Sequence, residues 1–259
     1  MDLGLAGKAA LVTGASRGIG RATATRLAEE GVAVAISARN PDELERAAGE
    51  LAEIGPPVVG ITADVALPGE VERLVDEAAG RLGRLDLLVA NAGGAVGGSL
   101  LGSSPEDWVT TFELNAGHAA RAVRASVPHM RRQGGGAVVV VASISGWKPA
   151  PRAQYGAAKA AEIYLAAALA RELAPEHIRV NAVSPGSIFA PGGGWDRYRT
   201  RDPERFSDFI ERDFPAGRLG TPEEVADVIV FLLSERARWV NGTNISVDGA
   251  QGRPSASGW

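Results

Sequence analysis

Short apolar runs alternate with longer amphipathic stretches along most of the chain. The runs are apolar almost throughout instead of at every second position, which is typical of parallel strands covered on both faces. We expect seven strands, at residues 9–12, 32–37, 58–61, 85–90, 137–142, 179–183 and 244–247. The stretches between them have helical periodicity and predict helices at residues 19–30, 41–53, 68–82, 105–132, 154–173 and 222–233.

Three of the predicted helices begin with the same short pattern. Thr221-Pro222-Glu223-Glu224 supplies a capping hydroxyl, a proline at the first helical position and acids in the first turn. Asn40-Pro41-Asp42-Glu43 and Ser104-Pro105-Glu106-Asp107 repeat it. Strands and helices in series predict right-handed crossovers. The sequence therefore predicts a single α/β domain over residues 1–259, a Rossmann fold with a doubly wound parallel sheet of about seven strands and helices on both faces.

Two segments interrupt this alternation. Residues 192–213 begin with three glycines and continue as a charge-dense stretch, and residues 250–259 contain Gly, Ser and Pro. We expect the second segment to be an irregular tail. No internal repeat and no linker divides the chain. A doubly wound sheet binds its ligands beyond the carboxyl ends of its strands, so functional residues are expected directly after strands.

Composition narrows the class of protein without identifying a function. Hydrophobic residues make up 45% and charged residues 22%, as in ordinary globular proteins. The net charge of -4 argues against nucleic acid as a partner. The absence of cysteine excludes disulfides, thiolate metal sites and cysteine nucleophiles. His118, His129 and His177 have no metal-ligand spacing, so we expect no metal site and place each on a helix surface or partly buried.

Two further absences concern membranes and export. Residues 1–8 lack a basic stretch followed by an apolar core, so no secretory signal is expected. No apolar run approaches the roughly 20 residues that span a bilayer. We therefore expect a cytoplasmic protein with no membrane partner.

A glycine-rich loop follows the first predicted strand and opens a helix. Glycines permit a tight turn and bring the backbone close to a pyrophosphate, which sits on the free N–H groups of the helix start. The spacing G-x-x-x-G-x-G differs from the commoner G-x-G-x-x-G, and three glycines alone also fit a flexible turn. The position of the loop favours dinucleotide binding by Gly14, Ser16, Arg17, Gly18, Ile19 and Gly20.

The end of the second strand indicates which dinucleotide binds. A cofactor without a 2′-phosphate usually meets an acidic residue about 20 residues past the glycines. This chain has Ala38-Arg39 there, with Arg17 at the same corner. Guanidinium groups suit phosphate because their donors form a planar fork. We therefore expect NADP(H); the alternative is that both arginines are ordinary surface residues.

Polar and small residues follow the third and fourth strands. Asp64 could accept a hydrogen bond from an adenine amino group, or it could form a turn or cap a helix. Asn91-Ala92-Gly93-Gly94 would let a cofactor lie flat, or could be an ordinary loop.

A tyrosine and a lysine four residues apart share one helix face, in Tyr155-Gly156-Ala157-Ala158-Lys159. A cation beside a phenol favours the phenolate, so that proton transfer becomes feasible near neutral pH. The pair alone could equally be a surface pair. Ser143 and Ser145 directly follow the fifth strand, where a hydroxyl could hold a substrate oxygen or form a turn.

In combination these motifs resemble the short-chain dehydrogenase/reductase family in order and spacing. They are residues 13–20, Asn91-Ala92-Gly93, Asn115, Ser143, Tyr155-x-x-x-Lys159 and Pro185-Gly186, and the resemblance extends to Val247-Asp248-Gly249. The resemblance implies that Tyr155 is the general acid in reduction and the base in oxidation. Lys159 would hold the nicotinamide ribose hydroxyls and favour the phenolate. Ser143 would orient the substrate carbonyl, and Asn115 would support a water chain that resupplies the proton.

The resemblance also implies cofactor contacts and a choice between the two serines. Ser143 is preferred to Ser145 because it is followed three residues later by glycine, as in the family. Expected contacts are Asp64 and Val65 with the adenine, Asn91 with the ribose region, and Pro185, Gly186 and Ile188 on the nicotinamide side. Ala92 and Gly93 beside Asn91 are also expected to bind the cofactor.

Ala190 departs from the family pattern, because many relatives carry a threonine there; its hydroxyl contact with the cofactor amide is then either missing or supplied by another residue. Residues 190–215 would form a substrate lid with aromatic surface at Trp195, Tyr198, Phe206 and Phe209. The helices at 105–132 and 154–173 would pack a homotetramer, or a homodimer.

The resemblance implies reduction of a 3-oxoacyl thioester or a similar carbonyl compound to an alcohol. Two alternatives stay open. One is an NAD-dependent alcohol or sugar dehydrogenase, and the other is a protein that senses NADP without catalysis.

Overall fold

Seven parallel strands form one sheet, as the apolar runs predict. The computed structural model describes residues 2–256, and the order of the strands is β3-β2-β1-β4-β5-β6-β7. After β3 the chain returns to place β4 on the other side of β1, so the strand order reverses between β1 and β4, and such sheets bind ligands at that point. The strands are β1 (Ala9–Thr13), β2 (Ala33–Ala38), β3 (Val58–Thr62), β4 (Leu87–Ala90), β5 (Gly136–Val141), β6 (Ile178–Pro185) and β7 (Asn244–Val247).

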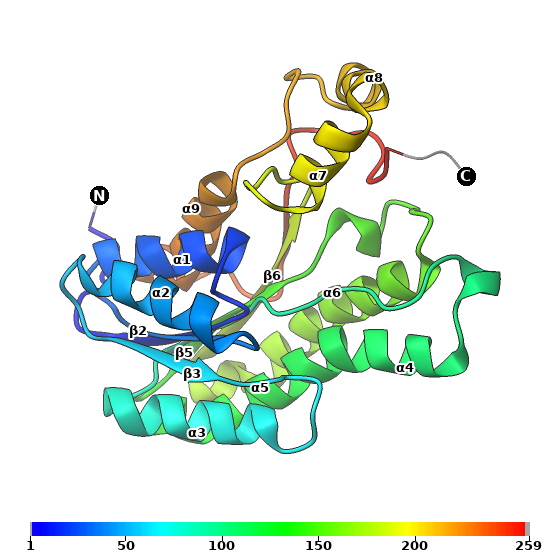
Figure 1. Cartoon of the computed structure of the whole chain (residues 1–259). Helices are drawn as coiled ribbons and strands as arrows, with labels where there is room; N and C mark the ends of the chain where they lie inside the picture. Colours follow the sequence, from blue (N-terminus) through cyan, green and yellow to red (C-terminus); the bar gives the residue numbers. More distant parts are fainter. Residues whose placement is uncertain (1, 257–259) are drawn as a thin grey trace.

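Helices cover both faces of the sheet (Figure 1). One face carries α1 (Gly18–Glu29), α2 (Pro41–Ala52) and α9 (Pro222–Leu233), and the other carries α3 (Glu70–Leu82), α4 (Pro105–Phe112), α5 (His118–Arg132) and α6 (Ala153–Leu173). Successive side chains of β1 enter different cores, because Ala10 and Val12 pack with one layer of helices and Leu11 with the other. The predicted single Rossmann domain is thus confirmed. In the described part of the chain, no helix is long and apolar enough to cross a membrane.

The prediction of one continuous helix at 105–132 is wrong, because the helix is interrupted in its middle. A π-type turn at Glu113–Gly117 separates α4 from α5, and it contains Asn115. Helical periodicity does not reveal such a turn, because the apolar positions continue on both sides of it. A π turn inserts one residue into the helix and is frequent at functional sites.

The interruption expected at 192–213 contains two helices that the sequence interpretation missed. They are α7 (Gly194–Arg201) and α8 (Pro203–Asp213), which rise above the sheet beside the end of the chain (Figure 1). Asp202 caps α8 by accepting a hydrogen bond from the Arg205 N–H at 3.3 Å. The sequence Asp202-Pro203-Glu204 repeats the cap, proline and acid pattern of three other helices, so a signal for α8 was present.

The residues after β7 contain neither helix nor strand as far as residue 256, and residues 257–259 of the expected tail lie outside the described residues. This tail is nevertheless anchored. Gln251 is 1% exposed, and its Oε1 accepts a hydrogen bond from the Ser187 N–H at 2.7 Å. The Gly252 N–H donates to the Asp213 carbonyl at 2.9 Å. The tail therefore joins the end of β6 to the end of α8.

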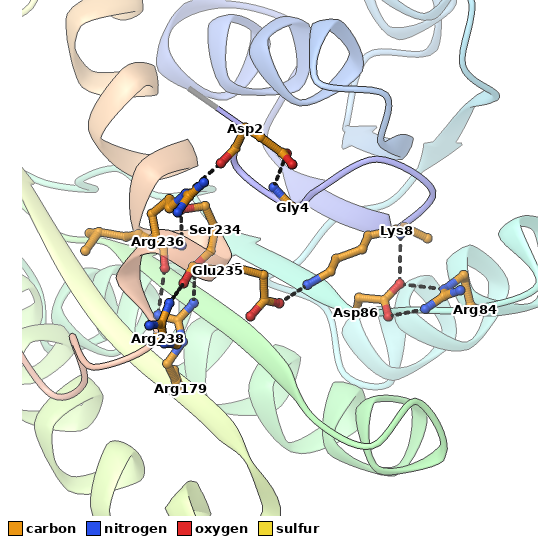
Figure 2. Close-up of polar contacts among 12 residues, drawn as sticks. Asp2, Gly4, Lys8, Arg84, Asp86, Arg179, Ser234, Glu235, Arg236 and Arg238 are labelled. Carbon is orange, nitrogen blue, oxygen red and sulfur yellow. Dashed lines mark hydrogen bonds and ion pairs between the residues drawn. The ribbon is translucent and has the colours of Figure 1, made fainter.

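A network of charged side chains lies at the amino ends of β1, β4 and β6, which is the edge of the sheet opposite the carboxyl ends of the strands (Figure 2). Asp86 accepts from the Ala9 N–H at 2.8 Å and from both ends of the Arg84 guanidinium. Lys8 pairs with Glu235, and Arg179 donates to carbonyls in the last turn of α9 and beyond it. A cavity of about 760 Å³ opens there, but its charged groups bind one another. We therefore assign this edge a structural role.

Candidate active site

The loop between β1 and α1 has the glycines it needs for close backbone approach. Gly14 has φ of 65°, and a Cβ there would lie 3.0 Å from the Ala92 Cα. A Cβ on Gly20 would lie 2.6 Å from the Gly14 carbonyl oxygen. Side chains are therefore excluded at both positions. The first turn of α1 has no side-chain cap, so its N–H groups remain available to an anion.

Asn91 fixes this loop from the neighbouring strand. Its Nδ2 donates to the carbonyls of Thr13 at 2.8 Å and Gly14 at 3.0 Å. The Thr13 hydroxyl in turn accepts from the backbone N–H groups of Asn91 and Ala92, each at 3.0 Å. The amide of Asn91 is thus used to hold the glycine turn, a structural role that the sequence did not predict.

The residues expected around the adenine and its ribose lie at the carboxyl ends of β1, β2 and β3. Arg17 and Arg39 are exposed, and neither has an ion-pair partner among residues 2–256. Asp64 accepts a hydrogen bond from the Ala66 N–H at 3.1 Å, which is the turn-forming role left open for it. Val65 is buried in the core, and its carbonyl accepts from Arg121 at 2.8 Å. The two arginines therefore offer free positive charge at this corner.

Nine of the predicted residues line one cavity of about 290 Å³ at the carboxyl edge of the sheet. They come from the start of α1, from the loops after β4 and β5, from the end of β6 and the loop after it, and from α6. Strand ends that are distant in sequence thus meet at the edge where a doubly wound sheet binds its ligand. These residues are Ile19, Asn91, Gly93, Ser143, Tyr155, Lys159, Pro185, Gly186 and Ile188.

The proposed proton-transfer groups are close together in this cavity. The Lys159 Nζ lies 5.7 Å from the centre of the Tyr155 ring and donates to the Val141 carbonyl at 2.9 Å. The Ser143 hydroxyl accepts from the Ser145 N–H at 3.1 Å, which leaves its own proton free to donate. The site thus contains a phenol, an ammonium and a hydroxyl around one space.

Asn115 lies behind the cavity instead of lining it. It is completely buried, and its Nδ2 donates to the carbonyls of Gly94 at 2.7 Å and Thr111 at 2.6 Å. Its Oδ1 accepts from the Gly94 N–H at 3.2 Å. A Cβ on Gly93 would lie 2.6 Å from that Oδ1 and 3.1 Å from the Lys159 Nζ, so only glycine fits between them.

A second cavity of about 530 Å³ adjoins the first, and Gly94, Tyr155 and Trp195 line both. Its other walls come from Ala95, from Ser145, from α7 and from two segments that the sequence interpretation did not assign to the site. These are residues 150–152, including Arg152, and the tail at Pro254 and Ser255. No motif in the tail indicated this position, because a chain segment without periodicity is placed only by its tertiary contacts.

Some aromatic residues of the predicted lid pack against one another, and others line the second cavity. Trp195 stacks on Phe209 with ring centres 5.1 Å apart, and Phe209 meets Phe214 edge-on at 5.1 Å. Phe206 packs against the same cluster. Trp195 and Tyr198 also line the second cavity. Phe206 and Phe209 therefore pack within the aromatic cluster, whereas Trp195 and Tyr198 also face the second cavity.

Buried charge surrounds Lys159. Burial lowers the pKa of Lys159, but the Glu162 carboxylate and then Tyr155 outweigh it, and the net pKa is raised. Burial raises the pKa of Glu162, against the opposing effect of the Lys159 ammonium. Burial and then the charges of Lys159 and Arg121 lower the pKa of His118 to about 3. His118 is completely buried, so its expected place at or near the surface is wrong.

Comparison with known proteins assigns the family. Residues 14–250 match the model of a family described as Enoyl-(Acyl carrier protein) reductase. Human dehydrogenase/reductase SDR family member 4 is 38% identical over 97% of this chain and 89% of its own length. The 3-oxoacyl-(acyl-carrier-protein) reductase FabG of Thermotoga maritima is 37% identical over 95% of this chain and 98% of its own.

Solved structures agree with these relatives. The L-sorbose reductase of Gluconobacter frateurii, complexed with NADPH and L-sorbose, superposes with a TM-score of 0.92. It is 36% identical, and the match covers 97% of this chain and 98% of that one. Fold, site geometry and relatives lead to one conclusion: the chain belongs to the short-chain dehydrogenase/reductase family of oxidoreductases.

Proposed function

We propose that this protein is an NADP(H)-dependent reductase that converts a ketone to a secondary alcohol, with Tyr155 as the general acid. One observation carries the proposal: Tyr155 lines both the cavity at the dinucleotide edge and the adjoining second cavity. A proton donor between a cofactor space and a substrate space is what hydride transfer to a carbonyl requires, because the carbonyl oxygen must be protonated as the carbon is reduced.

The residues around β1 and β2 fit a dinucleotide with a 2′-phosphate. The uncapped start of α1 and the side-chain-free turn at Gly14 and Gly20 would hold the pyrophosphate. Arg17 and Arg39 would bind the 2′-phosphate, since both are exposed and free of ion pairs in the described structure. When bound, NADPH supplies the hydride.

Four residues of the chain would carry the proton chemistry. Ser143 donates its hydroxyl to the substrate oxygen and orients the carbonyl, and Tyr155 delivers the proton. Lys159 favours the phenolate that remains and offers a donor to the ribose hydroxyls. Both hydrogens of the Asn115 side-chain amide already donate to the carbonyls of Gly94 and Thr111. Asn115 would therefore support resupply of the proton through the backbone groups of its π turn. Positioning and electrostatic stabilisation account for most of the rate in this scheme.

The second cavity would bind the substrate beneath a lid at residues 190–215. Trp195 and Tyr198 provide apolar surface, and Arg152 adds a cation to the lining of this cavity. Relatives named for a 3-oxoacyl thioester and for a sugar support substrates of either kind, and we favour a 3-oxoacyl thioester or a similar carbonyl compound. Ala190 supplies no hydroxyl to the cofactor amide.

We also infer an oligomer, a tetramer or a dimer, packed through α4, α5 and α6. Large apolar side chains on these helices face solvent in the single chain, with Val109 63%, Phe112 46% and Tyr164 78% exposed. Apolar surface of this kind is typical of an interface. The cytoplasmic location stays a prediction.

A substrate panel tests the proposed function. The wild-type protein is given NADPH and, in turn, short and long 3-oxoacyl thioesters, diketones and ketoses, and NADPH oxidation is followed. We expect turnover with at least one class, and faster turnover with NADPH than with NADH. Equal rates with NADH would favour the NAD-dependent dehydrogenase. NADPH binding without oxidation by any substrate would favour the sensor.

A further inference from the structure

Two polar side chains in the lining of the second cavity have no partner within the described protein. The Arg152 guanidinium makes no ion pair or hydrogen bond with any other residue of 2–256. The Ser145 hydroxyl is likewise unpaired in this part of the chain, since the contact of Ser145 with Ser143 uses the backbone N–H of Ser145. Both residues line the cavity together with Tyr155. The cavity therefore offers a cation and a hydroxyl donor to a bound molecule.

Packing of the loop after β5 against the start of α6 brings these two side chains together. A Cβ on Gly156 would lie 2.9 Å from the Ser145 carbonyl oxygen, so glycine at this position lets the loop approach the helix closely. Arg152 directly precedes the first turn of α6 and lies three residues before Tyr155, a spacing at which side chains on a helix are neighbours. Ser145, Arg152 and Tyr155 thus reach one space from two adjoining elements.

The charge of Arg152 is not balanced inside this cavity. No Asp or Glu is among the described residues that line it, and most of the other walls are apolar or aromatic. Two carboxylates on the segments that build the cavity have partners of their own. Asp196 on α7 pairs with Arg199 at 2.9 Å, and Asp248 after β7 pairs with Lys148 at 2.7 Å. An anionic group bound here would therefore meet an attractive charge without an opposing one.

The cofactor does not account for Arg152. The groups proposed to hold the dinucleotide phosphates lie around β1 and β2, with Arg17 and Arg39 at that corner. Arg152 lines the second cavity and does not line the first, which lies at the dinucleotide edge. Its guanidinium is therefore left for the substrate.

We propose that the second cavity selects ketones that carry a carboxylate or phosphate group, with Arg152 binding this oxyanion and Ser145 as a second donor. This inference rests on the proposed function and narrows its substrate class. The planar fork of a guanidinium fits either oxyanion through two parallel hydrogen bonds. Because Arg152 and Tyr155 are neighbours, the ketone and the oxyanion belong to one small molecule. A neutral ketose would leave the guanidinium unpaired.

Binding to the complex of the full chain with NADP+ tests the inference without turnover, because the oxidised cofactor has no hydride to give. Three probes share one methyl ketone: 4-oxopentanoate, 3-oxobutyl phosphate and the neutral methyl 4-oxopentanoate. Isothermal titration calorimetry measures their dissociation constants. We expect at least one anion to bind about 10-fold more tightly than the ester, since a charge-assisted contact at an exposed arginine contributes at the lower end of its range. The tighter anion identifies the group, carboxylate or phosphate, that the site prefers.

Variants assign the preference to individual side chains. Arg152→Gln removes the charge and should weaken binding of the preferred anion about 10-fold, which abolishes the preference over the ester. The Arg152 side chain does not cap α6, so this substitution should leave the helix intact. Arg152→Lys keeps the charge without the fork and should have an intermediate affinity. Ser145→Ala keeps the backbone N–H that binds Ser143 and should weaken binding about threefold.

Arg238→Gln is the matched control. It removes an exposed arginine at the opposite edge of the sheet, and it should leave all three affinities unchanged.

Equal affinity of the wild type for all three probes, or no measurable binding of either anion, would overturn the inference. So would a preference that survives in Arg152→Gln, or one that disappears in Arg238→Gln. The proposed function is judged separately, by NADPH oxidation across the substrate panel. Anion binding through Arg152 in a protein that reduces no ketone would refute the proposed function and leave the anion site in place.

Discussion

Acidification should destabilise the protein through His118. This side chain is fully buried, and its pKa falls to about 3 in the folded state, first because of burial and then because of the Lys159 and Arg121 charges. The pKa in the unfolded chain is about 6.5. Because the folded pKa is the lower one, the stabilising contribution is present above about pH 6.5 and is lost as the pH falls toward 3.

The magnitude follows from the two pKa values. At pH 5 the unfolded chain has bound nearly one full proton at this position and the folded chain almost none. The free energy of unfolding is then about 2 kcal/mol lower than at pH 7.5, and the loss approaches about 5 kcal/mol near pH 3. This is a large part of the stability of an ordinary domain.

His118→Gln isolates this contribution because it removes the titration and retains a polar side chain. Denaturant unfolding is measured for both proteins between pH 7.5 and 5.0 at one protomer concentration, so that any assembly contributes equally. The wild type should lose about 2 kcal/mol more than the variant over this range. Any pH-independent part of the difference in unfolding free energy between the two proteins reflects packing. If that difference does not change at all between pH 7.5 and 5.0, folded His118 binds a proton as readily as the unfolded chain does, and the reasoning is refuted.

Two further predictions concern the cofactor and the structural edge of the sheet. Arg39→Ala should weaken NADPH binding by about 10-fold and leave NADH within about threefold, as measured by cofactor fluorescence, because an exposed charge-assisted contact contributes at the lower end of its range. An equal loss for both cofactors would contradict a 2′-phosphate contact. Asp86→Ala should lower the free energy of unfolding by about 2–3 kcal/mol, since a buried carboxylate with three donors is lost, whereas the exposed Asp42→Ala should change it little. An unaffected Asp86 variant would remove the role assigned to the network in Figure 2.

The sheet was predictable because parallel strands buried on both faces leave a simple signal. Each predicted strand lies within two residues of an observed one at both ends. The strand order could not be read from the runs themselves. Capping patterns located the starts of α2, α4 and α9, where Asn40, Ser104 and Thr221 accept hydrogen bonds from the first turn.

The catalytic half of the site was predictable because its residues end or closely follow strands, or share a helix face. Ser143, Tyr155, Lys159 and Pro185 satisfy that rule, and they line one cavity. Asn115 was named from family resemblance, but its position behind the cavity depends on a π turn that periodicity does not show.

The residues that line the second cavity and the pairing of buried charges could not be predicted from the sequence. Pro254 reaches the second cavity because Gln251 and Gly252 are bound to Ser187 and Asp213, contacts between segments distant in sequence. Glu162 falls at a position where a helix could equally face solvent. Only the packing of α6 reveals that its charge is enclosed beside Lys159.

Turnover of Tyr155→Phe tests the central claim most directly. The change removes one hydroxyl and keeps the ring, so the protein should fold and bind NADPH with the affinity of the wild type. With the best ketone from the substrate panel, kcat should fall by at least about 100- to 10,000-fold, the range that general acid catalysis contributes. A variant that binds NADPH and retains kcat within about tenfold of the wild type would contradict the account, because the proton would then come from another group.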